Sequence, residues 1–114
     1  MHHNQADTAI QSYLENEDIV YGATQIFDAL SDYTRFQILS ALCVSDCSVS
    51  ELKELCHVTQ SAISHQLRLL RDRGLVSAHR EGQRVIYALA DDHVTTLMRV
   101  GLEHAAEAVP AEGE

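Results

Sequence analysis

The stretch from residue 48 to residue 74 most constrains the fold of this chain. Ser48 is followed three residues later by Glu51, a spacing typical of a capping box at the start of a helix. After a short turn, Thr59 is suited to begin a second helix, and Gly74 is suited to end it. One face of this second helix is apolar and the rest carries hydrogen-bonding side chains. Two helices joined by a tight turn, the second with a polar face, predict a helix-turn-helix.

A β-hairpin is predicted directly after this motif. Residues 76–79 and 84–89 are rich in β-forming residues and flank Glu81-Gly82-Gln83, which places glycine in the turn. Helical spacing and capping residues predict helices over residues 6–16, 21–30, 33–44, 48–56, 60–73 and 91–107. The fold class is therefore mainly α with a β-hairpin, a winged helix-turn-helix.

At 114 residues the chain is expected to form a single domain. Within it we expect an N-terminal arm and dimerisation helix (1–20), a helix-turn-helix (48–73), a wing (76–89), a dimerisation and metal-binding helix (91–107) and a frayed tail (108–114). No apolar run approaches the ~20 residues of a membrane span, and no signal peptide is visible at Met1. We therefore expect a cytoplasmic protein without a membrane partner. Cys43, Cys47 and Cys56 are odd in number and are interpreted as reduced thiols.

The charge distribution points to DNA even though the net charge is −9. Residues 1–56 carry two basic and nine acidic side chains, whereas residues 57–90 carry five arginines against two acidic side chains. A basic middle between acidic ends is the electrostatic footprint of a nucleic-acid interface. The side chains expected to contact double-stranded operator DNA are Gln60, Ser61, Ser64, His65 and Arg68 in the second helix and Gln83 and Arg84 in the wing. Arg71 and Arg73 are expected only to be solvated.

The last predicted helix carries four metal-ligand residue types, Asp91, His93, His104 and Glu107, with Asp91 or Asp92 as its N-cap. His93 and His104 are close to three turns apart, so they lie on one line but are separated by about 16 Å. Metal–nitrogen bonds are only about 2 Å long, so the two histidines of one chain cannot share a metal. An antiparallel helix from a second subunit would complete two four-ligand sites in a two-fold homodimer.

This oxygen and nitrogen donor set suits tetrahedral Zn(II), and Co(II) fits the same geometry. Ni(II) usually takes more ligands, which His2 or His3 are placed to add. Four protein ligands leave no open position for a substrate, and no nucleophile with a general base stands out. We therefore expect the chain not to be an enzyme.

Residues 58–71 (VTQSAISHQLRLLR) and the Gly74-Leu75-Val76 that follows closely resemble the recognition segment of ArsR/SmtB-type metal-sensing repressors. Residues 80–87 (REGQRVIY) resemble the wing of that family, and the spacing of the four ligand types on the last helix is similar to the zinc site of its zinc-sensing branch. The resemblance covers roughly residues 20 to 107. It implies a cytoplasmic homodimer that represses a metal-efflux or detoxification operon and leaves operator DNA when metal binds.

Residues 42–46 are similar to the third-helix metal segment of the family, but Ser45 stands where the second thiol of a Cys-X-Cys would be. A second metal or thiol site stays open, with the candidate residues Cys43, Asp46, Cys47, His2 and His3. Three alternatives to a zinc-responsive repressor follow: a nickel or cobalt sensor using the N-terminal histidines, a thiol redox sensor through Cys43 and Cys47, and a metal-bridged dimer without a regulatory role.

The sequence also suggests a route between metal and DNA. We expect the last helix to pack close to the end of the recognition helix. Its His104 would then donate from its second nitrogen to the free carbonyls around Arg73 and Gly74.

Overall fold

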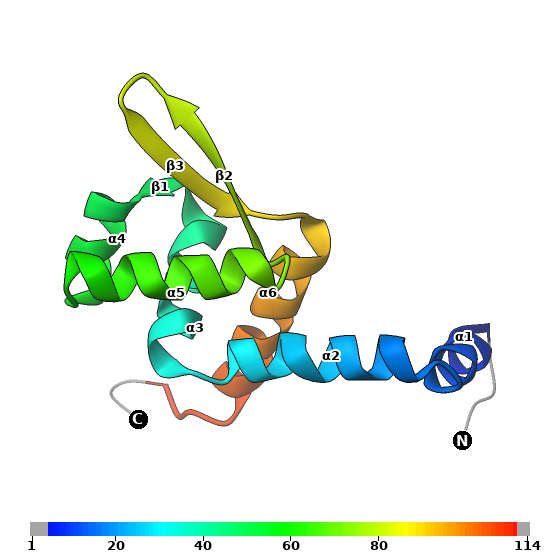
Figure 1. The fold of residues 1–114 in the computed structure, drawn as a ribbon. Helices are drawn as coiled ribbons and strands as arrows, with labels where there is room; N and C mark the ends of the chain where they lie inside the picture. Colours follow the sequence, from blue (N-terminus) through cyan, green and yellow to red (C-terminus); the bar gives the residue numbers. More distant parts are fainter. Residues whose placement is uncertain (1–4, 112–114) are drawn as a thin grey trace.

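The computed structural model describes residues 5–111, and side chains from residue 8 onward. In chain order the elements are α1 (Gln5–Leu14), α2 (Glu17–Leu30), α3 (Tyr33–Val44), β1 (Cys47–Ser48), α4 (Val49–Cys56), α5 (Gln60–Asp72), β2 (Val76–Glu81), β3 (Arg84–Leu89) and α6 (Asp92–Glu107) (Figure 1). Helices α4 and α5 form the helix-turn-helix, and β2 and β3 form the wing that rises beside them. The prediction of a winged helix-turn-helix is confirmed. No helix in the described part of the chain has the length and apolar character to span a membrane.

The sheet contains a third strand that was not predicted from the sequence. The strand order is β1-β3-β2, all antiparallel, and Cys47 of β1 pairs with Tyr87 of β3. A two-residue strand is too short to show the alternation by which strands are recognised. The hairpin between β2 and β3 turns at Gly82, whose φ of +61° is a conformation that glycine adopts without strain.

Local capping explains where the helices begin. The side chains of Asp32, Ser48, Thr59 and Asp91 each accept a hydrogen bond from a backbone N–H three residues later. Asn16 does the same for α2 by accepting from the N–H groups of Asp18 and Ile19. Helix α2 therefore starts at Glu17, earlier than the start at residue 21 that apolar spacing predicts.

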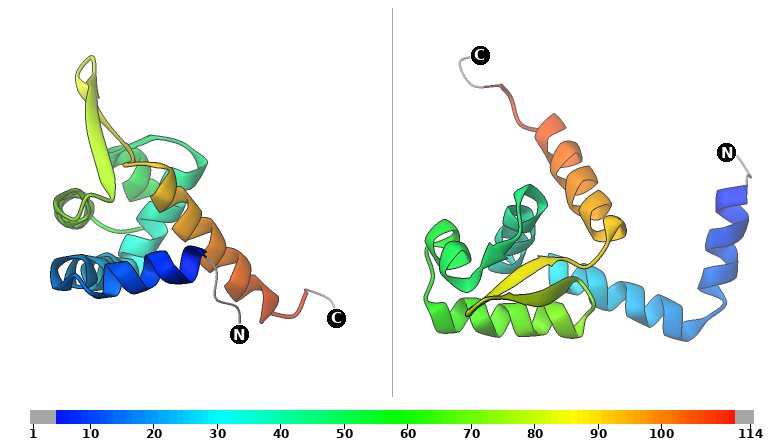
Figure 2. Two further views of the ribbon diagram at one scale, coloured as in Figure 1. Left: turned by 90° about the vertical axis from the view of Figure 1, so that its right-hand side faces the viewer. Right: turned by 90° about the horizontal axis from the view of Figure 1, so that it is seen from above.

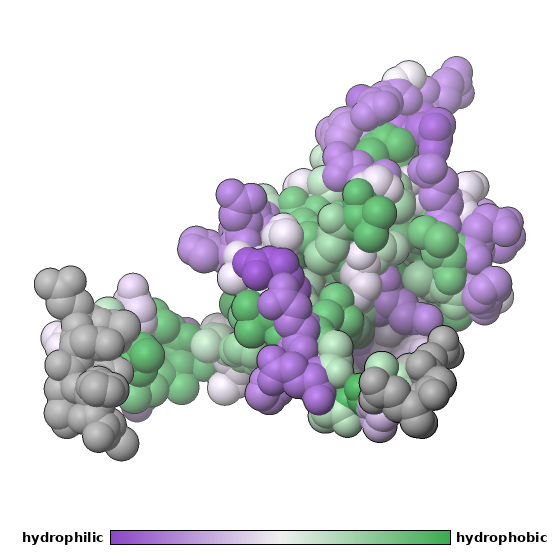
Figure 3. All heavy atoms as spheres, turned by 180° about the vertical axis from the view of Figure 1, so that it is seen from behind, coloured by the Kyte–Doolittle hydropathy of each residue, from purple (hydrophilic) through white to green (hydrophobic). Residues whose placement is uncertain are grey.

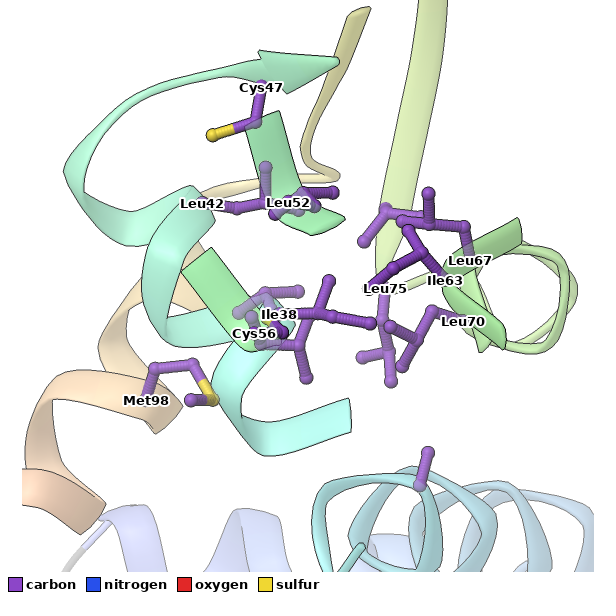
Figure 4. Close-up of a cluster of buried hydrophobic side chains, with 14 residues drawn as sticks. Ile38, Leu42, Cys47, Leu52, Cys56, Ile63, Leu67, Leu70, Leu75 and Met98 are labelled. Atoms are coloured by element: carbon purple, nitrogen blue, oxygen red, sulfur yellow. The ribbon is translucent and has the colours of Figure 1, made fainter. Parts of the chain in front are cut away.

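The core lies between α3, α4, α5 and the start of α6 (Figure 4). Its fully buried side chains are Ile38, Leu39, Leu52, Ile63, Leu67, Leu70 and Met98. Three of these lie on one face of α5, as its apolar spacing predicts. Each buried Leu or Ile contributes roughly 1.5–3 kcal/mol to stability. The packing fixes which face of α5 turns outward, so the core positions the polar face.

Helix α1 lies apart from this core. It packs against α2, and both α1 and the C-terminal end of α6 project away from α5 (Figure 2). Between α1 and α2 runs an apolar groove of about 440 Å³, visible as the green surface at the left of Figure 3. The groove is lined by Ile10, Tyr13, Leu14, Ile19, Val20, Ala23, Thr24 and Phe27. A helix of ten residues is marginal by itself in water, so α1 depends on its packing against α2.

Candidate DNA-reading face and metal-ligand pairs

The polar face of α5 is free to enter a DNA groove. All five side chains predicted to contact DNA from this helix, Gln60, Ser61, Ser64, His65 and Arg68, are exposed. They belong to the first two-thirds of a helix whose opposite face is buried. A recognition helix reads base edges with residues near its N-terminus, and here those residues carry donors and acceptors. The site therefore has the chemistry for direct reading of a major groove.

Of the two arginines near the end of α5, Arg71 is exposed as expected and Arg73 is not. Arg71 lines a hollow of about 370 Å³ that lies between α5 and Tyr87 of β3. Arg73 points away from it and donates from Nη1 to the backbone carbonyl of Gln25 at 2.9 Å. The expectation was thus wrong for Arg73, whose side chain is only 29% exposed. A contact across 48 residues of sequence leaves no local pattern to predict it from.

The wing presents Gln83 at its exposed turn, but Arg84 is already engaged. Its Nη2 donates to Oε1 of Glu51 at 2.9 Å, so the first strand residue after the turn is tied to the start of α4. The same carboxylate accepts from the backbone N–H of Ser48 at 2.9 Å, which completes the predicted capping box. Hydrogen bonds from Ser48 and the charge of Arg84 lower the pKa of Glu51.

The four ligand-type residues of the last helix form two separate pairs. Nδ1 of His93 lies 3.8 Å from Oδ1 of Asp91, and Nδ1 of His104 lies 4.0 Å from Oε1 of Glu107. The pairs stand at opposite ends of α6, and both histidines are almost fully exposed, at 97% and 87%. Within the described residues of one chain, no three His, Cys, Asp or Glu side chains gather as a metal site. Each pair thus offers half of a tetrahedral ligand set.

The expected contact between His104 and the end of α5 is absent from the described part of the chain. Helix α6 packs against α3 and β3. The residues after α5 meet the start of α6, because the N–H of Ala90 donates to the carbonyl of Leu75 at 3.0 Å. His104 lies twelve residues beyond Asp92, about 18 Å along the helix. The prediction that His104 bonds directly to the end of α5 was wrong within one subunit. It placed the C-terminal end of α6 beside the end of α5, whereas the N-terminal end of α6 lies there.

The second candidate site is not assembled in the described residues. Cys43 is half-buried in α3, Cys47 is buried in β1 above Leu42 and Leu52 (Figure 4), and Asp46 is exposed. Burial raises the pKa of both thiols, and Cys47 donates from Sγ to the carbonyl of Ser45 at 3.3 Å. A buried thiol with a raised pKa behaves as a small apolar side chain. The candidates His2 and His3 lie outside the described residues.

The exposed polar face of α5, the tight turn before it and the wing define a winged-helix DNA-binding protein. Comparison with known proteins gives the family. Residues 32–78 match the family described as bacterial regulatory protein, arsR family. The chain is 38% identical over 98 residues to a transcriptional repressor SmtB homolog of Synechocystis sp., covering 86% of this chain and 74% of the relative.

Two further likenesses agree. A cadmium resistance transcriptional regulatory protein CadC homolog of Staphylococcus aureus is 33% identical over 84 residues, covering 73% of this chain and 69% of that protein. A homodimeric winged helix-turn-helix DNA-binding domain from Mycobacterium bovis, described as a possible ArsR-family transcriptional regulator, superposes with a TM-score of 0.76 at 27% identity, covering 80% and 84% of the two chains. This chain belongs to the ArsR/SmtB family of metal-sensing transcriptional repressors, and it is a regulator rather than an enzyme.

Proposed function

We propose that this protein is a cytoplasmic, Zn(II)-responsive repressor that binds double-stranded operator DNA as a homodimer and releases it when Zn(II) binds. The observation that carries the proposal is the pair of incomplete ligand sets at the two ends of α6. Each set supplies one imidazole and one carboxylate, and a second, antiparallel copy of α6 supplies the other two ligands. The homodimer then holds two equivalent tetrahedral sites related by its two-fold axis.

The apolar groove between α1 and α2 supports pairing of two subunits. Tyr13, Leu14 and Phe27 are each more than half exposed in the single chain, at 56%, 64% and 59%. Helix α1, which forms one wall of this groove, and the C-terminal end of α6 both project away from α5 (Figure 2). Subunits that meet through these two elements would leave both copies of α5 free to read two half-sites of an operator. The M. bovis relative with the same fold is described as homodimeric.

The chemistry of the four ligand side chains favours Zn(II) as the effector over soft metals. Two imidazoles and two carboxylates are hard-to-borderline ligands that Zn(II) binds in tetrahedral geometry, whereas soft metals favour thiolates. The cysteines of the described chain are buried or half-buried with raised pKa values, so they do not offer thiolates at neutral pH. Co(II) has the same geometric preference and serves as a spectroscopic substitute.

DNA release follows if Zn(II) binds one arrangement of the two subunits better than another. A metal shifts an equilibrium only by its difference in affinity for the two states. The usual coupling between two sites is about 1–3 kcal/mol, and DNA must weaken zinc binding by the same factor. In this dimer the metal would join both copies of α6 and so fix how the two subunits are placed relative to each other.

Mixed dimers test whether each site is shared between subunits. One variant chain carries Asp91→Ser with His93→Ala, and the other carries His104→Ala with Glu107→Ala. Serine keeps the N-cap of α6, so loss of metal is not confused with fraying of the helix. Neither variant alone should bind Zn(II) or Co(II) tightly, because each homodimer has only half of every ligand set.

A mixture of the two variants should regain one complete site in each mixed dimer, seen as the visible absorption of tetrahedral Co(II). The same mixed dimers should release operator DNA on adding Zn(II), to a smaller extent than wild type. No recovery of metal binding on mixing would mean that the ligands do not come from two subunits. Tight binding by either variant alone would refute the assignment of the ligands.

A further inference from the structure

Arg73 fastens the end of the DNA-reading helix to α2. Its guanidinium donates to the carbonyl of Gln25 at 2.9 Å and lies 3.8 Å from Oδ2 of Asp28. The Arg73 side chain therefore extends from the end of α5 to the last turns of α2. Arginine presents several donors in a rigid plane, so a guanidinium between two helices restricts their relative position more than a single flexible charge does.

Arg35 makes a second bridge between the same two helices. From the first turn of α3 it donates from Nε to the carbonyl of Ala29 at 2.9 Å and from Nη2 to the carbonyl of Asp28 at 3.3 Å. Both carbonyls belong to the last turn of α2, and that of Asp28 also accepts from the N–H of Ser31 at 3.1 Å. From Nη1 it also donates to Oε1 of Gln66, in the middle of α5, at 3.3 Å. One side chain thus contacts the end of α2 and the centre of the recognition helix.

The helices that these arginines join share α3 as a packing neighbour and otherwise contact different elements. Helix α2 packs against α1 and α3, whereas α5 packs against α3, α4 and β2. Hydrogen bonds from Arg73 and Arg35 therefore provide a polar connection between α2 and α5 at two places along α5. Side chains of α2 between Ile19 and Phe27 line the apolar groove with α1, which is the surface that our proposed function assigns to subunit pairing. Helix α2 thus contributes both to the proposed pairing surface and to the hydrogen bond with Arg73 at the end of α5.

We infer that Arg73 and Arg35 are positioning residues that fix the angle of α5 on α2 and thereby set the half-site spacing that the dimer accepts. The inference rests on the proposed dimeric binding of operator DNA. A dimer reads two half-sites about one helical turn, or a multiple of it, apart. The distance and angle between its two recognition helices select that spacing. Loosening both bridges leaves each helix able to read its half-site but lets the spacing vary.

The test uses the full chain with Arg73→Gln and Gln66→Ala combined. The first change removes the bond from Arg73 to Gln25, and the second removes the acceptor of Arg35 on α5. Arg35 keeps its bonds to the carbonyls of α2. The matched control is Arg71→Gln with Gln66 unchanged, because Arg71 carries the same charge at the same end of α5 and makes neither contact with α2. Binding is measured on a series of operators whose two half-sites are moved apart or together by single base pairs, and on a single half-site.

Wild type should show a sharp optimum of spacing. The Arg73→Gln/Gln66→Ala variant should lose roughly tenfold in affinity at that optimum, the size of effect that one charged hydrogen bond gives, and should differ little between neighbouring spacings. The Arg71→Gln control should bind all spacings more weakly by one common factor and keep the optimum. Arg73→Lys combined with Gln66→Ala retains one donor for the carbonyl of Gln25 on a flexible side chain, so it should restore only part of the spacing preference.

A double variant that keeps the wild-type optimum and its sharpness overturns the inference, and so does an Arg71→Gln control that flattens the profile equally. A fall in single half-site affinity that matches the whole loss on paired sites would also overturn it, because the effect would then be on DNA contact rather than on spacing. Failure of the proposed function is recognised separately: wild type itself would then bind paired half-sites no better than one.

Discussion

Arg84 of the wing and Glu51 of α4 are joined by a hydrogen bond of 2.9 Å from Nη2 to Oε1. The carboxylate that holds Arg84 also closes the capping box at the start of α4, so one side chain serves the helix and the wing. Both partners are more than half exposed, so water screens their attraction and Arg84 can exchange Glu51 for a DNA phosphate at little cost. The pair thus holds the Arg84 side chain at the first turn of α4.

Glu51→Gln should remove a part of the acid sensitivity of folding. Hydrogen bonds from Ser48 and the charge of Arg84 lower the pKa of Glu51 in the folded chain. Its ionised form therefore stabilises the fold above the unfolded pKa of about 4.3, and this stabilisation is lost as the pH falls through the lower folded pKa. Urea denaturation at successive pH values should show wild type and variant converging in acid. Glu54→Gln, a change of the same kind on the same helix but outside the capping box, is the matched control.

Ser48→Ala should lower the free energy of unfolding by about 1 kcal/mol, the usual effect of removing a helix N-cap. The hydroxyl of Ser48 accepts from the N–H of Glu51 at 3.3 Å, and alanine cannot replace it. Ser50→Ala is the matched control, since Ser50 is exposed in the first turn of α4 and is not the cap. Equal losses in the two variants would contradict the capping role.

Ser64→Ala combined with His65→Ala should abolish operator binding and leave zinc affinity nearly unchanged. Both side chains lie on the exposed face of α5, far in the sequence from the ligand pairs of α6. Fluorescence anisotropy with labelled operator measures the first effect, and competition with a zinc chelator measures the second. Unaltered operator binding would show that another element reads DNA.

Tyr13→Glu should weaken dimerisation. Tyr13 lines the apolar groove between α1 and α2, and a charge there would be buried if a second subunit covers the groove. Val44→Glu provides the control, because Val44 is 86% exposed at the end of α3 and lies outside the groove. Equilibrium sedimentation at micromolar concentration should show more monomer for the first variant only. Equal behaviour of the two variants would place the subunit interface elsewhere.

The cysteines should react slowly with iodoacetamide in the native protein. Burial raises the pKa of Cys43, Cys47 and Cys56 above that of an exposed thiol, so thiolate forms only as the pH rises well above neutral. Mass spectrometry should therefore find little modification at pH about 7 and increasing modification in alkali, with complete reaction after unfolding. Fast formation of a disulfide between Cys43 and Cys47 under mild oxidation would instead favour a thiol sensor.

Features that depend on residues within one helical turn were predictable from the sequence. The caps Ser48 and Thr59 begin α4 and α5 where expected, because a side chain that satisfies a free N–H acts only three residues away. The start of α2 shows how such signals compete. Apolar spacing alone predicts a start at residue 21, but Asn16 followed by Glu17 and Asp18 is the stronger signal, since acidic residues favour the first turn.

Contacts between distant segments could not be predicted in the same way. The pairing of Cys47 with Tyr87 depends on how β1 meets the hairpin, and the bond from Arg73 to Gln25 depends on how α5 lies relative to α2. The ligand types on α6 were identifiable because helical geometry alone places His93 and His104 at its two ends. Whether a second subunit completes the sites remains a prediction, since the geometry of one chain supplies only pairs.

The isolation of α1 has a consequence for how much of this repressor a cell can maintain. A newly made subunit that has not met another would expose the apolar side of α1, and such a surface attracts chaperones and proteases. If subunits pair as proposed, pairing would protect the chain by mass action, and its lifetime would lengthen as its concentration rises. Below the concentration at which subunits pair, degradation would outpace accumulation. Synthesis would then have to exceed a threshold before the operator could be occupied at all.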